Sequence, residues 1–213
     1  MHKTEFQIGP YRIIAEMSER RVKEADVAAG LGDVDSVIEG EFIFRNKLLI
    51  QTKPDYVASI LQNGSPIFFL NAHGDDYNGE WCYFDGYEED ENAIPVEQKL
   101  EQIAAEGVRS AFIFSCNPNR HVIESTPIPV LYPTYSLSEE DMHDFLTVKL
   151  PNGMHLDKDK QLDIVLSYID LLYDTEKESC PILAILEKNH RVYEKMRRCA
   201  REFFQKEGEK NEE

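Results

Sequence analysis

Two residues able to do nucleophilic chemistry each end an apolar segment of this 213-residue sequence. His73 ends the run PIFFLNAH (residues 66–73), and Cys116 ends the run RSAFIFSC (residues 109–116). A thiol becomes a nucleophile when a base takes its proton, and imidazole is the side chain that titrates near neutral pH. Because the two residues stand far apart in the sequence, only the fold can bring them together.

Acyl-transfer chemistry also needs hydrogen-bond donors for the oxygen that becomes negative during the reaction. Gly74 follows His73 and has no Cβ, so its backbone N–H can approach a substrate carbonyl closely. The N–H of Cys116 is a second candidate donor. Asn117 and Asn119 follow the cysteine, where we expect them to line the substrate pocket, although asparagines there also suit an ordinary turn.

The elements that must position these residues form a strand–helix–strand unit. Continuous apolar runs such as 66–73 and 109–116 are typical of parallel strands that are buried on both faces. Between them, residues 95–107 predict a helix that begins at Pro95 and ends at Gly107. Strand, helix and strand at this spacing predict a βαβ unit, in which the two strands are parallel and the crossover is right-handed. Sites in such sheets form beyond the carboxyl ends of the strands.

The other segments predict an α/β fold, a three-layer sandwich with a mostly parallel central sheet. The expected strands are residues 10–17, 37–51 with a bend at Gly40, 81–86 in a hairpin or edge position, and 127–133 at an edge because of its prolines. The expected helices are residues 18–32 capped by Ser18, 53–64, 157–178 capped by Asp157 or Asp159, and a long one after Pro181. Residues 1–205 are expected to be one domain, followed by a fraying polar tail at 206–213.

Composition narrows the classes of function. The formal net charge of −17 disfavours binding to nucleic acid or to an anionic membrane surface. The N-terminus lacks the apolar region of a signal peptide, and no run approaches the ~18 apolar residues of a membrane span. The four cysteines include no CxxC pair, which favours reduced thiols in the cytoplasm, no structural zinc and no cofactor.

The two strand ends resemble those of the caspase-like cysteine peptidases, a group that includes caspases, metacaspases, gingipains, clostripain, separase and the CHAT proteases. Their signature is an apolar strand ending in His-Gly and a later apolar strand ending in the nucleophilic cysteine; here these are IFFLNAHG and AFIFSC. The resemblance covers residues 50–135. It implies a caspase-like fold, a peptide or protein substrate, His73 as general base and acid, Cys116 as nucleophile and Gly74 in the oxyanion hole.

The chain also departs from that group. The caspase pentapeptide around the cysteine is absent, and Phe114 stands where metacaspases carry the acidic residue that receives a basic side chain. The resemblance therefore gives no expectation of cleavage after Arg or Lys.

Two other interpretations remain open. His73 and Cys116 could each be structural, and the chain would then be an inactive caspase-like module that binds a partner protein in a signalling or defence system. The segment AHGDD also resembles the AHPDD motif of zinc-dependent N-acetylglucosaminyl deacetylases, which implies zinc-site roles for His73, Asp75 and Asp76. Gly74 replaces the proline of that motif, the later HxxH-type ligands are missing, and His121 compensates only in part.

Overall fold

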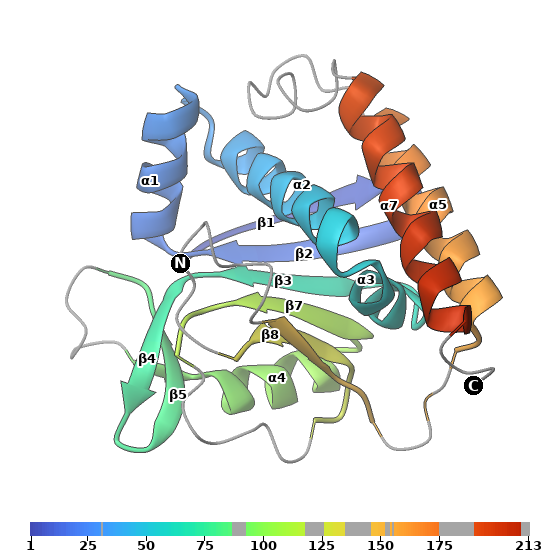
Figure 1. The fold of residues 1–213 in the computed structure, drawn as a ribbon. Helices are drawn as coiled ribbons and strands as arrows, with labels where there is room; N and C mark the ends of the chain where they lie inside the picture. The colour runs from blue at the N-terminus through green and yellow to red at the C-terminus, as the bar shows by residue number, and fades with distance from the viewer. Residues whose placement is uncertain are drawn as a thin grey trace.

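The computed structural model describes residues 1–30, 32–86, 93–117, 126–134, 146–151, 154, 156–174 and 190–209. These residues form an α/β fold around a six-stranded sheet with the order β1-β2-β3-β7-β8-β9 (Figure 1). The strands of this sheet are β1 (His2–Ile8), β2 (Tyr11–Met17), β3 (Ile67–Asn71), β7 (Ser110–Phe114), β8 (Val130–Pro133) and β9 (Leu146–Lys149). Strands β2, β3, β7 and β8 are parallel, and β1 and β9 flank them as antiparallel edges, so the prediction of a mostly parallel sheet is confirmed.

Helices cover both faces of the sheet, which gives three layers (Figure 1). The helices are α1 (Glu19–Ala29), α2 (Val34–Thr52), α3 (Pro54–Leu61), α4 (Val96–Ala105), α5 (Lys158–Asp174) and α7 (His190–Glu209). Helix α4 lies on one face with an apolar cluster of its own, while α2, α3, α5 and α7 lie on the other face over a larger cluster. We call these the α4 face and the α2 face.

The two strands expected to carry the site are direct neighbours. All five residues of β3 and all five of β7 are buried, and the strands pair in parallel from Ile67 opposite Ser110 to Asn71 opposite Phe114. A hydrogen bond of 3.0 Å from the N–H of Ala72 to the carbonyl of Phe114 extends the ladder beyond the last pair. The predicted pair of buried parallel strands is therefore confirmed.

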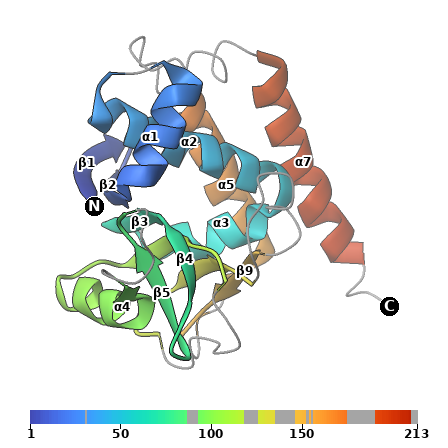
Figure 2. The same ribbon diagram turned by 90° about the vertical axis from the view of Figure 1, so that its left-hand side faces the viewer.

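A second, antiparallel sheet begins where β3 ends. It contains β4 (His73–Tyr77), β5 (Glu80–Phe84) and the short β6 (Ile94–Pro95), in that order. The β4–β5 hairpin turns at Asn78 and Gly79, whose φ angles of 55° and 85° are those that a two-residue type I′ turn requires. Figure 2 shows this hairpin projecting past the sheet near α4 and below α1. The expectation of a hairpin strand at 81–86 is met by β5.

The prediction of a β segment at residues 37–51 is wrong, because these residues belong to helix α2. Twelve of the 19 residues of α2 are buried, among them Glu41, Arg45 and Lys47. A helix that is covered on most sides has no polar face, so its sequence lacks the apolar stripe that identifies surface helices. Gly40 lies inside this helix and not at a bend between strands.

The edges of the sheet also differ from expectation. Residues 127–133 were expected at an edge, but β8 pairs with β7 on one side and β9 on the other. Its prolines are tolerated because Pro129 contributes only its carbonyl, which accepts from the N–H of Ala111, and Pro133 ends the strand. The edges are instead β1 and β9, neither of which the sequence analysis identified.

Helix boundaries agree closely with the capping signals. The Ser18 side chain accepts from the N–H of Arg21 at the start of α1, and Gly30 ends that helix with a φ of 67°. Asp157 accepts from the N–H of Lys160 at the start of α5, so Asp157 and not Asp159 is the cap. Helix α7 continues to Glu209, several residues into the tail expected to fray from residue 206. Within the described ranges, no helix has the length and apolarity needed to cross a membrane.

Candidate functional site

The carboxyl ends of β3 and β7 bring the His73 and Cys116 segments to the same edge of the sheet. Along β3, Ile67 and Phe69 point to the α2 face and Phe68 and Leu70 to the α4 face. Side chains alternate between faces with a period of two, so His73 follows Asn71 on the α2 side. Cys116 lies two residues beyond Phe114, the last residue of β7, which like Phe112 belongs to the apolar cluster on the α2 face.

The backbones of the two segments touch at Gly74. A Cβ at position 74 would overlap the Ser115 Oγ and would lie 2.8 Å from the Cys82 carbonyl oxygen and 3.0 Å from the Cys116 carbonyl oxygen. Only glycine fits such an approach without displacing its neighbours. Gly74 was expected to allow a close approach, and the group that comes close to it is the Ser115–Cys116 segment itself.

The β4–β5 hairpin holds the segment after β7 by two further contacts. The indole Nε1–H of Trp81, a buried residue on β5, donates to the Cys116 carbonyl oxygen over 3.1 Å. The Nδ2 of Asn117 donates to the Asp75 Oδ1 over 3.2 Å, and Asn117 has a positive φ of 49°. Asn117 thus fastens the segment to β4, while Asn119 lies outside the described residues.

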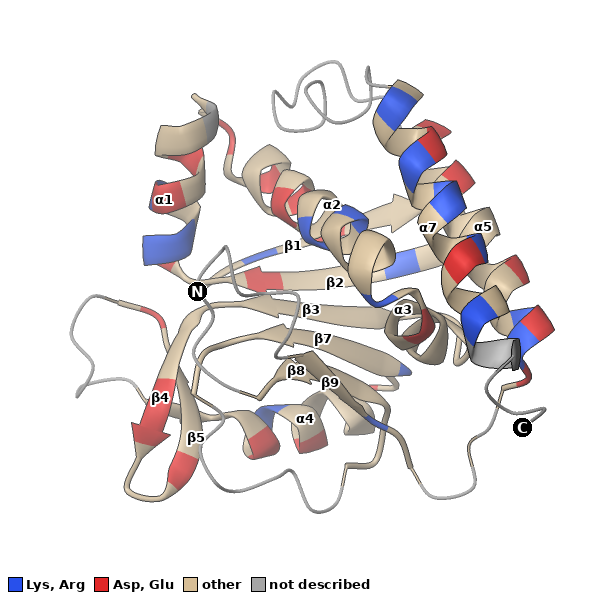
Figure 3. Cartoon of the chain, in the orientation of Figure 1, with Lys and Arg blue, Asp and Glu red and all other residues tan. Residues whose placement is uncertain are grey.

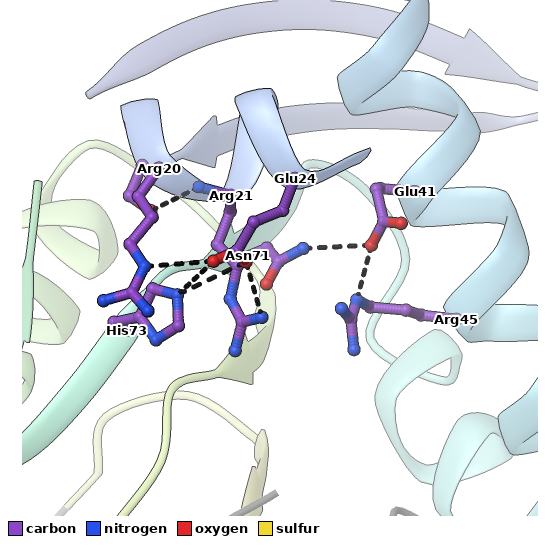
Figure 4. A network of polar contacts seen from close by, with 8 residues as sticks. Arg20, Arg21, Glu24, Glu41, Arg45, Asn71 and His73 are labelled. Atoms are coloured by element: carbon purple, nitrogen blue, oxygen red, sulfur yellow. Dashed lines mark hydrogen bonds and ion pairs between the residues drawn. The ribbon is translucent and has the colours of Figure 1, made fainter. Parts of the chain in front are cut away.

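Helix α1 supplies the partner of His73. The His73 Nε2 lies 3.3 Å and 3.4 Å from the two carboxylate oxygens of Glu24, and the histidine is half-buried (Figure 4). Helix α1 is anchored at this end of the sheet, since the N–H of Ser18 donates to the Asn71 carbonyl over 3.0 Å. A carboxylate on one imidazole nitrogen fixes the ring orientation and the tautomer, which leaves Nδ1 as the nitrogen that can accept a proton.

Two arginines of α1 surround the same carboxylate. Arg20 Nε and Arg21 Nη1 each lie 3.0 Å from a Glu24 oxygen (Figure 4). Burial would raise the pKa of Glu24, but the charge of Arg21 and the hydrogen bond from Arg20 outweigh it, so the pKa is lowered. Burial lowers the pKa of His73, the charge of Arg21 lowers it further, and Glu24 opposes both. The imidazole is therefore neutral at pH 7, the form that accepts a proton.

A second row of polar side chains lies behind this pair, between α1 and α2. Asn71 Nδ2 donates to Glu41 Oε2 over 3.1 Å, and Arg45 Nε donates to the same oxygen over 2.8 Å. All three side chains are buried, and the Arg45 guanidinium lies over the Phe114 ring, 5.3 Å from its centroid. Figure 4 shows Asn71 between the Arg21–Glu24 pair and the Glu41–Arg45 pair.

The cysteines within the described residues are thiols in different surroundings. Cys82 is buried on β5, and burial raises the pKa of its thiol. Cys116 and Cys199 are both partly exposed residues. Cys180 lies outside the described residues.

The AHGDD segment has a structural role in the hairpin. Asp75 Oδ1 accepts from Asn117 and from the N–H of Asp76, and Asp76 Oδ1 accepts from the N–H of Gly79 in the turn over 2.7 Å. Across the described part of the chain, no three His, Cys, Asp or Glu residues are gathered so that they could hold a metal ion. His121, the remaining candidate ligand, lies outside that part, and zinc-dependent deacetylation stays a prediction.

Sequence reasoning missed Glu24, Arg21, Asn71 and the Glu41–Arg45 pair. Glu24 and Glu41 lie on helices far from His73 in the sequence, so only the tertiary fold brings them to it. One signal was readable, because Asn71 is a polar residue two positions before His73 in an otherwise apolar strand. Alternation alone places it beside the histidine.

Comparison with family models, with curated proteins and with solved structures gives no match to this chain.

Proposed function

We propose that this protein is a cysteine hydrolase of the caspase-like type, a peptidase, with His73 and Cys116 as its catalytic dyad. The observation that carries the proposal is the parallel pairing of β3 and β7, whose register ends at Asn71 opposite Phe114. Two residues beyond these ends stand His73, the first residue of β4, and Cys116. The contact between Gly74 and the Cys116 backbone supports the same juxtaposition.

The reaction follows from the groups present. His73 takes the thiol proton, and the Cys116 sulfur attacks the carbonyl carbon of the peptide bond. Backbone N–H groups of Gly74 and Cys116 are the donors for the oxyanion. As the C–N bond breaks, His73 gives its proton to the leaving amine and a thioester remains. Water then attacks the thioester with His73 as base, which releases the carboxylic acid and restores the thiol.

Glu24 is a positioning residue in this scheme. Its carboxylate is 3.3 Å from the His73 Nε2 and opposes the effect of burial and of Arg21 on the imidazole pKa. An imidazole held at Nε2 works through Nδ1, and its positive charge is stabilised by the carboxylate once the thiol proton has been taken.

Thiol reactivity tests the dyad. We expect iodoacetamide to alkylate Cys116 much faster than Cys199, which is also partly exposed and serves as the internal control. The difference should vanish in His73→Ala, because the base that forms the thiolate is gone. Equal and slow alkylation of both thiols in the unaltered protein would overturn the proposal.

Peptide cleavage tests the reaction. The protein is incubated with a pool of proteome-derived peptides, and new termini are identified by mass spectrometry. Cleavage that is lost in Cys116→Ala and kept in Cys199→Ala supports the peptidase. A fast-reacting Cys116 with no cleavage of any peptide would contradict peptidase activity and favour a binding module.

A further inference from the structure

A cavity of about 90 Å³ with a partly polar lining lies between α1 and α2, over the ends of β2 and β3. Its polar lining is contributed by Arg21, Glu24, Glu41, Arg45 and Asn71. One water needs only about 10–15 Å³ of such space, so the cavity admits a group of several heavy atoms. Glu24 lines the cavity and also contacts His73, which makes the cavity adjacent to the imidazole.

The charges of the lining cancel. Arg21 Nη1 is paired with Glu24 at 3.0 Å, and Arg45 Nε is paired with Glu41 at 2.8 Å. A cationic or anionic ligand would therefore bring a net charge into a lining whose own charges are already balanced. Since removing a charge from water without a partner is strongly unfavourable, the lining selects an uncharged ligand.

Two residues that line the cavity each carry a buried polar atom with no hydrogen-bond partner among the described residues. The first is the Asn71 Oδ1, on a side chain that belongs to a residue only 1% exposed. Its orientation is determined, because the Nδ2 must face the Glu41 carboxylate, which can only accept. The second is the Arg21 Nε, which can only donate. Together these two atoms lack one donor and one acceptor.

A primary carboxamide is the side-chain group that supplies both. We propose that this cavity binds the carboxamide of a glutamine or asparagine side chain next to the bond that is cleaved. Its NH₂ donates to Asn71 Oδ1 and its carbonyl accepts from Arg21 Nε. The inference rests on the peptidase function proposed above for the substrate, but the recognition of a carboxamide can be measured without turnover.

Matched peptides measure the preference. Fluorogenic peptides that differ at one position carry Gln, Asn, Glu, Lys or Leu; Glu and Leu have nearly the shape of Gln but lack the neutral amide. We expect kcat/KM for the Gln or Asn peptide to exceed that for Glu, Lys and Leu by about tenfold to a hundredfold. Cleavage with a preference for Glu, Lys or Leu would overturn the proposed carboxamide pocket but would leave the proposed peptidase activity in place.

Two variants locate the preference in the cavity. Asn71→Leu removes the acceptor, and Arg21→Lys keeps the positive charge but removes the Nε donor. Each is expected to reduce the ratio of kcat/KM between the Gln and Leu peptides toward unity. If either folded variant keeps the full ratio, recognition occurs elsewhere and the inference fails. The matched control Arg20→Lys also changes an arginine that contacts Glu24, but Arg20 does not line the cavity, so the ratio should be retained.

A binding measurement separates the two proposals. The unaltered protein is titrated with N-acetylglutamine methylamide while the side-chain amide of Asn71 is followed by ¹H–¹⁵N NMR, with N-acetylglutamate methylamide as control. Saturable shifts with the glutamine compound alone support the pocket even if no peptide is cleaved, in which case only the peptidase function fails. Equal shifts, or none, would show a cavity that holds water only and would overturn the inference.

Discussion

The two sides of the candidate site are built from different interactions. On the hairpin side, β4 and β5 hold the Cys116 segment by the contact at Gly74, by the hydrogen bond from Trp81 to the Cys116 carbonyl and by the Asn117–Asp75 hydrogen bond. On the helix side, α1 and α2 surround His73 and Asn71 with two arginine–carboxylate pairs. Figure 3 shows charged residues on α1 and α2 at this end of the sheet. The hairpin side sets the position of the Cys116 segment. The helix side sets the protonation of His73 and the proposed choice of ligand in the cavity.

This difference predicts that the helix side is the costlier one to alter, because its Glu41–Arg45 ion pair is buried. Glu41→Leu removes the carboxylate that accepts from both Arg45 and Asn71. We expect the free energy of unfolding to fall by about 3 kcal/mol, as when a buried pair loses one member. Urea denaturation measures this loss. Glu41→Gln keeps the side-chain shape and an acceptor oxygen, so it should lose less; equal losses would argue against the pairing.

On the hairpin side the largest effect is steric. Gly74→Ala puts a methyl group where the Ser115 Oγ lies, with two carbonyl oxygens close by. We expect the free energy of unfolding to fall by about 1–3 kcal/mol, which is the usual cost of an added carbon in a filled site. The double variant Gly74→Ala, Ser115→Ala removes the overlapping oxygen and should recover part of the loss. No recovery would mean that Ser115 is not the obstacle.

Trp81→Phe is a milder test of the same side. It removes the hydrogen bond to the Cys116 carbonyl but leaves an aromatic ring next to Tyr132, whose centroid is 5.6 Å from that of Trp81. The expected loss in the free energy of unfolding is about 1 kcal/mol, measured by urea denaturation. Because no charge is involved, the loss should not change with salt concentration; a strong salt dependence would contradict the comparison of the two sides.

The smallest effects are shifts in titration on the helix side. The pKa of His73 lies below its usual value, so the unfolded chain binds more protons and stability falls as the pH drops below about 6.5. Arg21→Gln removes a charge that lowers this pKa, so the His73 pKa should rise and the acid limb of kcat/KM should move to higher pH. Glu24→Gln removes the opposing charge, so the His73 pKa should fall and the acid limb of kcat/KM should move to lower pH.

NMR of the imidazole protons follows the same two variants directly, with His73→Ala identifying the signal. Shifts in the same direction for Arg21→Gln and Glu24→Gln would contradict the assignment of opposite roles. Trp81→Phe is the matched control on the hairpin side and should leave the His73 pKa unchanged.

How much the sequence revealed depended on whether a signal was local. The runs 66–73 and 109–116 were readable as buried strands because they are continuously apolar and too short for a typical helix, and Pro66 and Gly74 bound the first of them. The Asn78–Gly79 pair is a strong local signal for a hairpin, and it predicts strands on both sides of the turn, as β4 and β5 are. Helix α2 was misassigned because burial on most sides removed its helical periodicity. The partners of His73 could not be predicted from the sequence, since α1 and α2 approach it only through the tertiary fold.

The hairpin starts at His73 itself, and this has a consequence for how the histidine moves. Only Ala72 separates the last paired residue of β3 from the first pair of β4, His73 with Phe84, so no loop isolates the imidazole from either sheet. Its backbone can be displaced only when hairpin pairs open. Amide hydrogen exchange at His73 should therefore proceed at the same rate as exchange at Phe84, the residue opposite it, and the opening rate of the hairpin sets the fastest rate at which this end of the sheet can rearrange.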